Sequence, residues 1–158
     1  MATATLSVTH TESISLNDRE QGGTKTFTIA SIADVYKRIV TCPASSDTTV
    51  ATFQTLTSTA DNAIDLELTK YIRVTNLDDS NSVNLSLQVA GAEGGTANMS
   101  TTILLAAGES FAMGTPHDGI ALSDASAGIV VSLNDLESIL IDPGSNAVAV
   151  EVFVASTA

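Results

Sequence analysis

Apolar and polar side chains alternate at every second residue along much of this chain. The clearest case runs from Val83 to Val89, where valine and leucine alternate with asparagine, serine and glutamine. Four valines repeat the pattern between Val148 and Val154. This period matches a β-strand, whose successive side chains point to opposite faces of a sheet, and conflicts with the 3.6-residue period of a helix. The chain is therefore predicted to be all-β.

Turn-forming residues divide this pattern into short strands. The Asp- and Asn-rich turn at 78–81 should join strands at 71–77 and 83–89 into the clearest hairpin of the chain. About nine to eleven strands with turn signals at this spacing are typical of sandwiches and barrels. We expect one antiparallel β-sandwich domain over residues 1–158, with at most one short helical turn and with a jelly roll as one form it could take. Turns are predicted at 21–24, 78–81, 94–95 and 142–146.

The basic residues are confined to the first half of the chain. Six Lys and Arg stand against 18 Asp and Glu, which gives a net charge of −12, and no Lys or Arg occurs from Val74 to Ala158. Nucleic-acid binding needs basic side chains to displace counterions from phosphates, and an anionic membrane attracts the same side chains. We therefore expect neither nucleic acid nor a membrane as partner.

The first residues and the single cysteine give two further expectations. The stretch from Met1 to Val8 has no basic start and no continuous apolar run, so no signal peptide is predicted. No stretch approaches the ~20 apolar residues of a membrane-spanning helix. Cys42 cannot form an internal disulfide, and its place in an apolar, β-branched stretch predicts a small buried hydrophobe.

No residue pattern predicts catalysis, a metal or a cofactor. Metal sites need converging ligands, whereas His10 and His117 stand apart in the sequence, and His117 is expected to be a solvated loop residue. The loop at Asp78 and Asp79 offers oxygens for calcium, but it lacks the glycine and the distal glutamate of an EF-hand, and turn formation explains the same residues. Ser110 follows Gly-Glu as in a nucleophile elbow, without the second glycine or the following helix. We therefore expect a non-enzymatic protein.

A carbohydrate-binding module is the alternative from another functional class, because such modules also use β-sandwiches. Sugar rings usually stack on exposed aromatic side chains. This chain has no Trp and only two Tyr, and its four Phe are expected to fill the core. The aromatic platform would therefore be thin.

Five blocks of the chain follow a pattern of strand, turn, strand and then a Gly-Glu-Ser-Phe strand. They run from Lys70 to Ser80, from Val83 to Val89, from Ile103 to Met113, from Asp135 to Ile141 and from Val148 to Thr157. Over residues 64–154 the chain thereby resembles small β-sandwich structural proteins of tailed bacteriophages, particularly marine ones.

The resemblance implies a virion protein without an active site. Its most direct form is a capsid decoration or cement protein that binds and stabilises the head lattice, and a tail, head–tail accessory or tube protein is the alternative. Its partners would be the major capsid protein or other virion proteins together with further copies of itself, a trimer being favoured. It would be made in the host cytoplasm and lie on the capsid surface. The charge asymmetry then predicts docking through the basic side chains, namely Lys37, Arg38, Lys70 and Arg73.

Overall fold

A computed structural model describes residues 3–55, 63–90, 99–122, 128–129 and 132–158. All regular secondary structure in these ranges is β-strand, and they include no helix long and apolar enough to cross a membrane. The strands are β1 (Ala4–Glu12), β2 (Ser15–Leu16), β3 (Arg19–Glu20), β4 (Gly23–Cys42), β5 (Thr48–Gln54), β6 (Ile64–Asp65), β7 (Thr69–Asn76), β8 (Val83–Val89), β9 (Met99–Leu105), β10 (Ser110–Met113), β11 (Leu136–Asp142) and β12 (Val148–Thr157).

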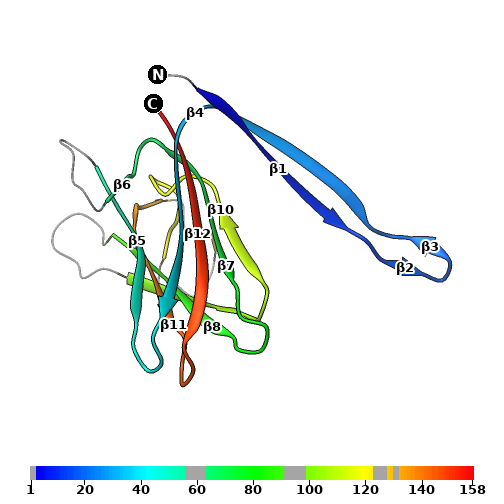
Figure 1. The fold of residues 1–158 in the computed structure, drawn as a ribbon. Coiled ribbons are helices and arrows are strands. Elements are labelled where there is room, and N and C mark those ends of the chain that lie inside the picture. Colours follow the sequence, from blue (N-terminus) through cyan, green and yellow to red (C-terminus); the bar gives the residue numbers. More distant parts are fainter. Residues whose placement is uncertain (1–2, 56–62, 91–98, 123–127, 130–131) are drawn as a thin grey trace.

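Two five-stranded sheets pack against each other to form a β-sandwich (Figure 1). The strand order is β1-β4-β12-β7-β10 in the first sheet and β6-β5-β11-β8-β9 in the second. All neighbours pair antiparallel except β5 and β6, which pair in parallel. Without β1 and β6, the order β4-β12-β7-β10 over β5-β11-β8-β9 is that of an eight-stranded jelly roll. The predicted all-β sandwich is therefore confirmed.

The core lies between the sheets and is built from the alternating positions. Val148, Val150, Val152 and Val154 of β12 are at most 1% exposed, and they belong to one cluster with the apolar face of β8. Burying each such side chain stabilises the fold by about 1.5–3 kcal/mol. Cys42 is also fully buried in this cluster, as predicted, and its burial raises the pKa of its thiol.

The predicted hairpin of 71–77 and 83–89 is wrong, although both strands and the turn exist. β7 belongs to the first sheet and β8 to the second, so their connection crosses the sandwich instead of closing a hairpin. β12 pairs with β7, and β11 pairs with β8. The turn residues fix a reversal of the chain, but pairing with strands from the far end of the sequence decides which sheet each strand joins.

An arm of residues 4–32 projects from the sandwich (Figure 1). It consists of β1, the first half of β4 and the small β2–β3 tip. The turn predicted at 21–24 is wrong: the chain reverses at Asn17 and Asp18, whose φ angles of 52° and 60° suit a two-residue hairpin turn. Gly22 serves close packing instead, because a Cβ there would lie 2.1 Å from the Glu12 carbonyl oxygen. The turn predicted at 94–95 lies outside the described residues.

Candidate functional site

The arm has two chemically different faces. Cross-strand pairing places Leu6 opposite Ile29 and Val8 opposite Phe27, which makes one face apolar. The other face carries hydroxyl groups, with the Oγ1 atoms of Thr9 and Thr26 2.9 Å apart and those of Thr11 and Thr24 3.2 Å apart. An amphipathic ribbon of this kind can cover an apolar surface while its hydroxyl face meets water.

The arm packs on the first sheet of the sandwich through its root, which is the part of the arm nearest the sandwich. The Phe27 ring lies 6.4 Å from the Tyr71 ring, which in turn lies 6.1 Å from Phe153 on the outer face of the first sheet. Tyr71 is buried there in a small second core with Ile32 and Ala155. Phe27, by contrast, is 41% exposed, so the expectation that all four phenylalanines fill the core is wrong for this one.

The tip of the arm offers apolar side chains to solvent. Every residue from Thr9 to Gln21 is exposed, and Ile14 and Leu16 are 55% and 59% exposed. A two-stranded hairpin is marginally stable by itself in water. The distal half of the arm therefore exposes apolar side chains on an element that gains little stability from the sandwich.

Two of the four predicted docking residues converge on one carboxylate. On the outer face of the first sheet, Lys37 Nζ lies 3.1 Å from Glu151 Oε2, and Arg73 donates to the other oxygen of the same carboxylate. Arg73 also donates to Thr75 Oγ1 over 2.6 Å. The hydrogen bond from Lys37, supported by Arg73, lowers the pKa of Glu151.

The other two predicted docking residues lie elsewhere. Arg38 follows Lys37 in β4 and so points to the opposite face, where its guanidinium lies 6.0 Å from the Tyr36 ring centroid. Lys70 donates to the Glu67 carbonyl oxygen over 2.8 Å. The four basic side chains therefore do not form one continuous patch, because strand alternation separates neighbours in the sequence.

Four loops meet at the end of the sandwich where β4 ends and β5 begins. The Ser45 amide donates to the Gly144 carbonyl over 2.6 Å, and Asn146 Nδ2 donates to Asn81 Oδ1 over 3.1 Å. Buried Asn76 extends the network, since its amide nitrogen donates to the carbonyls of Asn81, Leu105 and Ala106. These hydrogen bonds join the loops at this end of the sandwich to one another.

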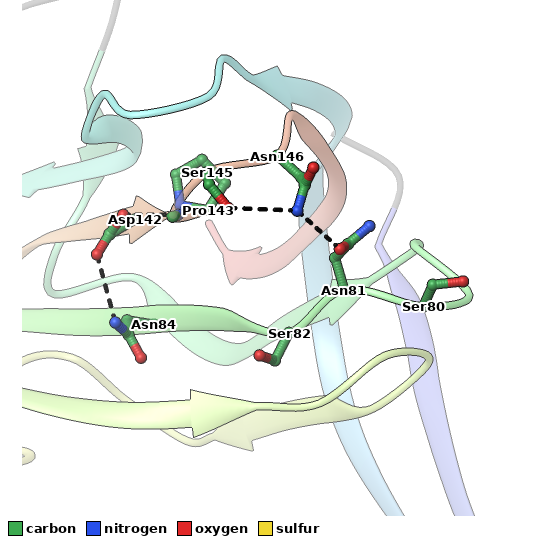
Figure 2. A pocket seen from close by; sticks show the side chains of 9 residues that line it. Ser80, Asn81, Ser82, Asn84, Asp142, Pro143, Ser145 and Asn146 are labelled. Atoms are coloured by element: carbon green, nitrogen blue, oxygen red, sulfur yellow. Dashed lines mark hydrogen bonds between the residues drawn. The ribbon is translucent and has the colours of Figure 1, made fainter.

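A polar hollow of about 310 Å³ opens between two of these loops (Figure 2). Among its lining residues, Asn84 donates to Asp142 at one end, and Asn146 donates to Asn81 at the other end. Hydroxyl and amide groups and one carboxylate could bind a polyhydroxylated ligand here, but no aromatic side chain lines it. The lining residues are Ser80, Asn81, Ser82, Asn84, Asp142, Pro143, Gly144, Ser145 and Asn146.

The acidic loop at Asp78 is organised by turn formation. Asp78 Oδ1 accepts the backbone N–H groups of Ser80 and Asn81 at 2.9 and 2.7 Å, and these bonds lower the pKa of Asp78. Asp79 Oδ1 accepts the Ser80 hydroxyl. One oxygen of each of these two carboxylates thus takes part in the hydrogen bonds of the turn.

His117 has a partner that its sequence neighbours did not suggest. Its Nδ1 lies 2.9 Å from Asp135 Oδ1, and its Nε2 lies 3.6 Å from Asp118 Oδ2. Asp135 also accepts the Asp118 backbone N–H over 2.8 Å. These three side chains could together offer ligands to a metal ion, but the same contacts join the 114–119 loop to the start of β11.

The sequence did not reveal the arm, although it contained one signal. Between residues 5 and 28, the alternating positions carry mainly threonine and serine on one side and only scattered large apolar residues on the other. A strand with so little apolar surface cannot fill a core, which is consistent with its place outside the sandwich.

Comparison with known proteins gives no family for this chain. No protein-family model and no curated protein matches it. A solved structure described under the words "Bacillus endospore appendages form a novel family of disulfide-linked pili" is similar at 11% sequence identity, with a TM-score of 0.38. That likeness covers 78% of this chain and 89% of the other. It is too low to support an argument about fold or function.

Proposed function

We propose that this protein is a non-enzymatic structural component of a tailed-phage virion, most simply a decoration protein that binds and stabilises the capsid lattice. The observation that carries the proposal is the projecting arm with its exposed apolar tip. The resemblance of residues 64–154 to phage structural proteins supplies the virion context. A tail or head–tail location would use the same arm.

Two properties of the molecule support a binding role for the arm. Its tip presents Ile14 and Leu16 on a hairpin that would be only marginally ordered alone. The sandwich to which it is attached is stabilised by a continuous apolar core and, at one end, by hydrogen bonds between its loops. A rigid body with one extended contact element suits a protein whose task is to hold other subunits together.

Lattice binding would stabilise a capsid through mass action. A protein that binds the assembled shell and not its dissociated subunits shifts the equilibrium toward assembly. Many copies on symmetry-related sites add avidity. Because the molecule has a net charge of −12, copies on a crowded surface repel one another, and apolar contacts at the arm would have to outweigh that repulsion.

The experiment that tests this proposal is co-sedimentation with phage heads assembled from the major capsid protein encoded with this chain. We expect the wild-type protein to sediment with the heads and the double variant Ile14→Ser/Leu16→Ser to lose at least about tenfold in occupancy. Leu104→Ser is the matched control, because Leu104 is 65% exposed on β9 outside the arm. Absence of wild-type binding, or equal loss in the control, would refute the proposal.

Carbohydrate binding is a second candidate because of the polar hollow in Figure 2. Its amide and hydroxyl groups can exchange hydrogen bonds with sugar hydroxyls, although none of its described lining residues is aromatic. A glycan array, followed by calorimetric titration of Asn84→Ala, tests this candidate. Binding that Asn84→Ala abolishes would favour the sugar module, whereas an empty array would remove it.

A further inference from the structure

Strand β4 changes its partners halfway along its length. Residues 23–32 pair with β1 on one side, and residues 32–42 pair with β12 on the other. From Ala33 onward, the side of β4 that faces away from β12 pairs with no other strand in the described part of the chain. Unpaired N–H and C=O groups along such an edge can pair with a strand of another molecule.

The side chains along this edge are exposed and self-complementary in charge. Asp34 and Arg38 are four residues apart, so they lie on the same face of the strand, with Tyr36 between them. Neither forms an ion pair within the described residues, and the Arg38 guanidinium lies over the Tyr36 ring. On the other face, Val35 is 49% exposed and Ile39 is 64% exposed.

We propose that two copies of this chain associate through antiparallel pairing of their β4 edges, around a two-fold axis that passes beside Tyr36. In this register residues 33–39 of one copy lie opposite residues 39–33 of the other. Asp34 of each copy then lies opposite Arg38 of its partner, which forms two equivalent ion pairs. The two first sheets become one continuous sheet across the dimer.

Charge selects this register over its neighbours. When two strands are related by a two-fold axis perpendicular to the sheet, residues directly opposite each other point to the same face of the sheet. The numbers of two such paired residues therefore sum to an even value. Moving the axis to Lys37 or to Arg38 would place that cation directly opposite its own copy, and like charges directly opposite each other destabilise a strand pair. Moving it toward Val35 would bring Arg38 opposite Ile32, where Ala4 of β1 already pairs.

The bend at the root of the arm leaves space for the partner strand. Ser31 has a φ angle of 62°, and the β1–β4 register shifts between Ala4 and Leu6. Beyond this point the arm diverges from the line of the sandwich strands (Figure 1). The end of the partner's β4 can therefore continue past residue 39 beside the body.

The test is the solution mass of the full chain by light scattering after gel filtration, over a concentration series. We expect the wild type to show twice 16.2 kDa. Asp34→Arg and Arg38→Asp should each raise the dimer dissociation constant at least tenfold. The double variant Asp34→Arg/Arg38→Asp should restore the dimer, because it rebuilds both ion pairs with exchanged signs and returns the net charge to −12.

Asp47→Arg is the control, since it changes the net charge as Asp34→Arg does but lies in the β4–β5 loop. Loss of the dimer in this control would show a general charge effect and overturn the proposal. A wild-type monomer, a trimer, or a double variant that stays dissociated while folded by circular dichroism would also overturn it. The inference is independent of capsid binding, which the co-sedimentation experiment tests separately.

Discussion

Glu151 is the position where the basic first half and the acidic second half of the chain meet. Its carboxylate accepts hydrogen bonds from Lys37 and Arg73 and is only 14% exposed, whereas Lys37 is 58% exposed. The solvent around Lys37 screens that pair, so the contact to Arg73 should contribute more to stability. The acidic half thus has one carboxylate that is neutralised by cations from strands on both sides.

We expect Glu151→Gln to destabilise the protein at neutral pH by about 1 kcal/mol, or about 3 °C in Tm. The pKa of Glu151 is lowered in the folded state, so its stabilising effect is complete above the ordinary value of 4.5 and is lost as the pH falls through the lower folded value. The difference from wild type should therefore shrink in acid. Thermal unfolding across a pH series measures this, with exposed Glu67→Gln as control. A pH-independent difference would contradict it.

Asn76 is the second residue with an expected large effect. Its side chain is fully buried, donates to loop carbonyls and accepts the Asp78 amide over 3.0 Å. Asn76→Ala would leave these buried groups without partners and should cost about 2–3 kcal/mol. Chemical denaturation measures the change. Exposed Asn84→Ala should stay within about 0.5 kcal/mol of wild type, and an equal loss in both would show that burial of Asn76 is not the cause.

For single residues, the sequence predicted which side chains are buried better than it predicted which side chains they contact. The inward valines of β12 and buried Cys42 follow from local alternation alone. The partners of Glu151 and His117 do not, because they lie on strands or loops distant in the sequence. Fold topology brings them together, and a single sequence carries no signal of that pairing.

Among the elements, the arm contacts the sandwich through a short row of rings, beside the aliphatic side chains of Leu6, Val8 and Ile29. His10, Phe27, Tyr71 and Phe153 follow one another with centroid distances of 6.1–6.4 Å. The row ends at Phe153, which also contacts the Arg73 guanidinium. The orientation of the arm should therefore depend on Phe27 more than on its hydroxyl face.

Phe27→Ala should release the arm without unfolding the body. We expect hydrogen exchange of the β1 amides to accelerate at least tenfold, while amides of β7 and β12 keep their protection. Thr26→Ala, one residue away on the opposite face, is the control and should change little. Unchanged exchange in β1 would mean that other contacts hold the arm.

The strands themselves could be predicted, but the sheets they join could not. Alternation placed β7, β8 and β12 close to their observed bounds. It gave no reason to separate β7 from β8, because a hairpin and a crossover need the same turn residues between them. The arm was missed for a related reason: alternation predicts a strand but does not say whether a sheet receives it.

For the whole molecule, net charge and sheet topology limit association with other molecules in different ways. A net charge of −12 favours separate, soluble molecules, so any association must be specific enough to overcome repulsion. The jelly roll leaves few places for such contacts, and the arm and the free edge of β4 are two of them. Both include part of β4, so a partner bound to the arm would affect the position of the free edge, and a partner bound to the edge would affect the position of the arm.

The position of β12 leads to a prediction about the complete fold. A chain that stops at residue 147 should show no cooperative unfolding transition, because β4 and β7 would both lose their common neighbour. Adding a synthetic peptide of residues 148–158 should restore one. Circular dichroism during thermal denaturation follows both steps, and a stable fragment 1–147 would contradict the expectation.

The same arrangement governs when the sandwich can fold during its synthesis. β11 lies between β5 and β8, and β12 lies between β4 and β7, so the strand that completes the middle of each sheet is synthesised after the other described strands of that sheet. Until then, the earlier strands expose apolar faces and unpaired edges to solvent. Folding must therefore follow translation of nearly all the described strands, and the nascent chain would depend on chaperones until β12 is inserted.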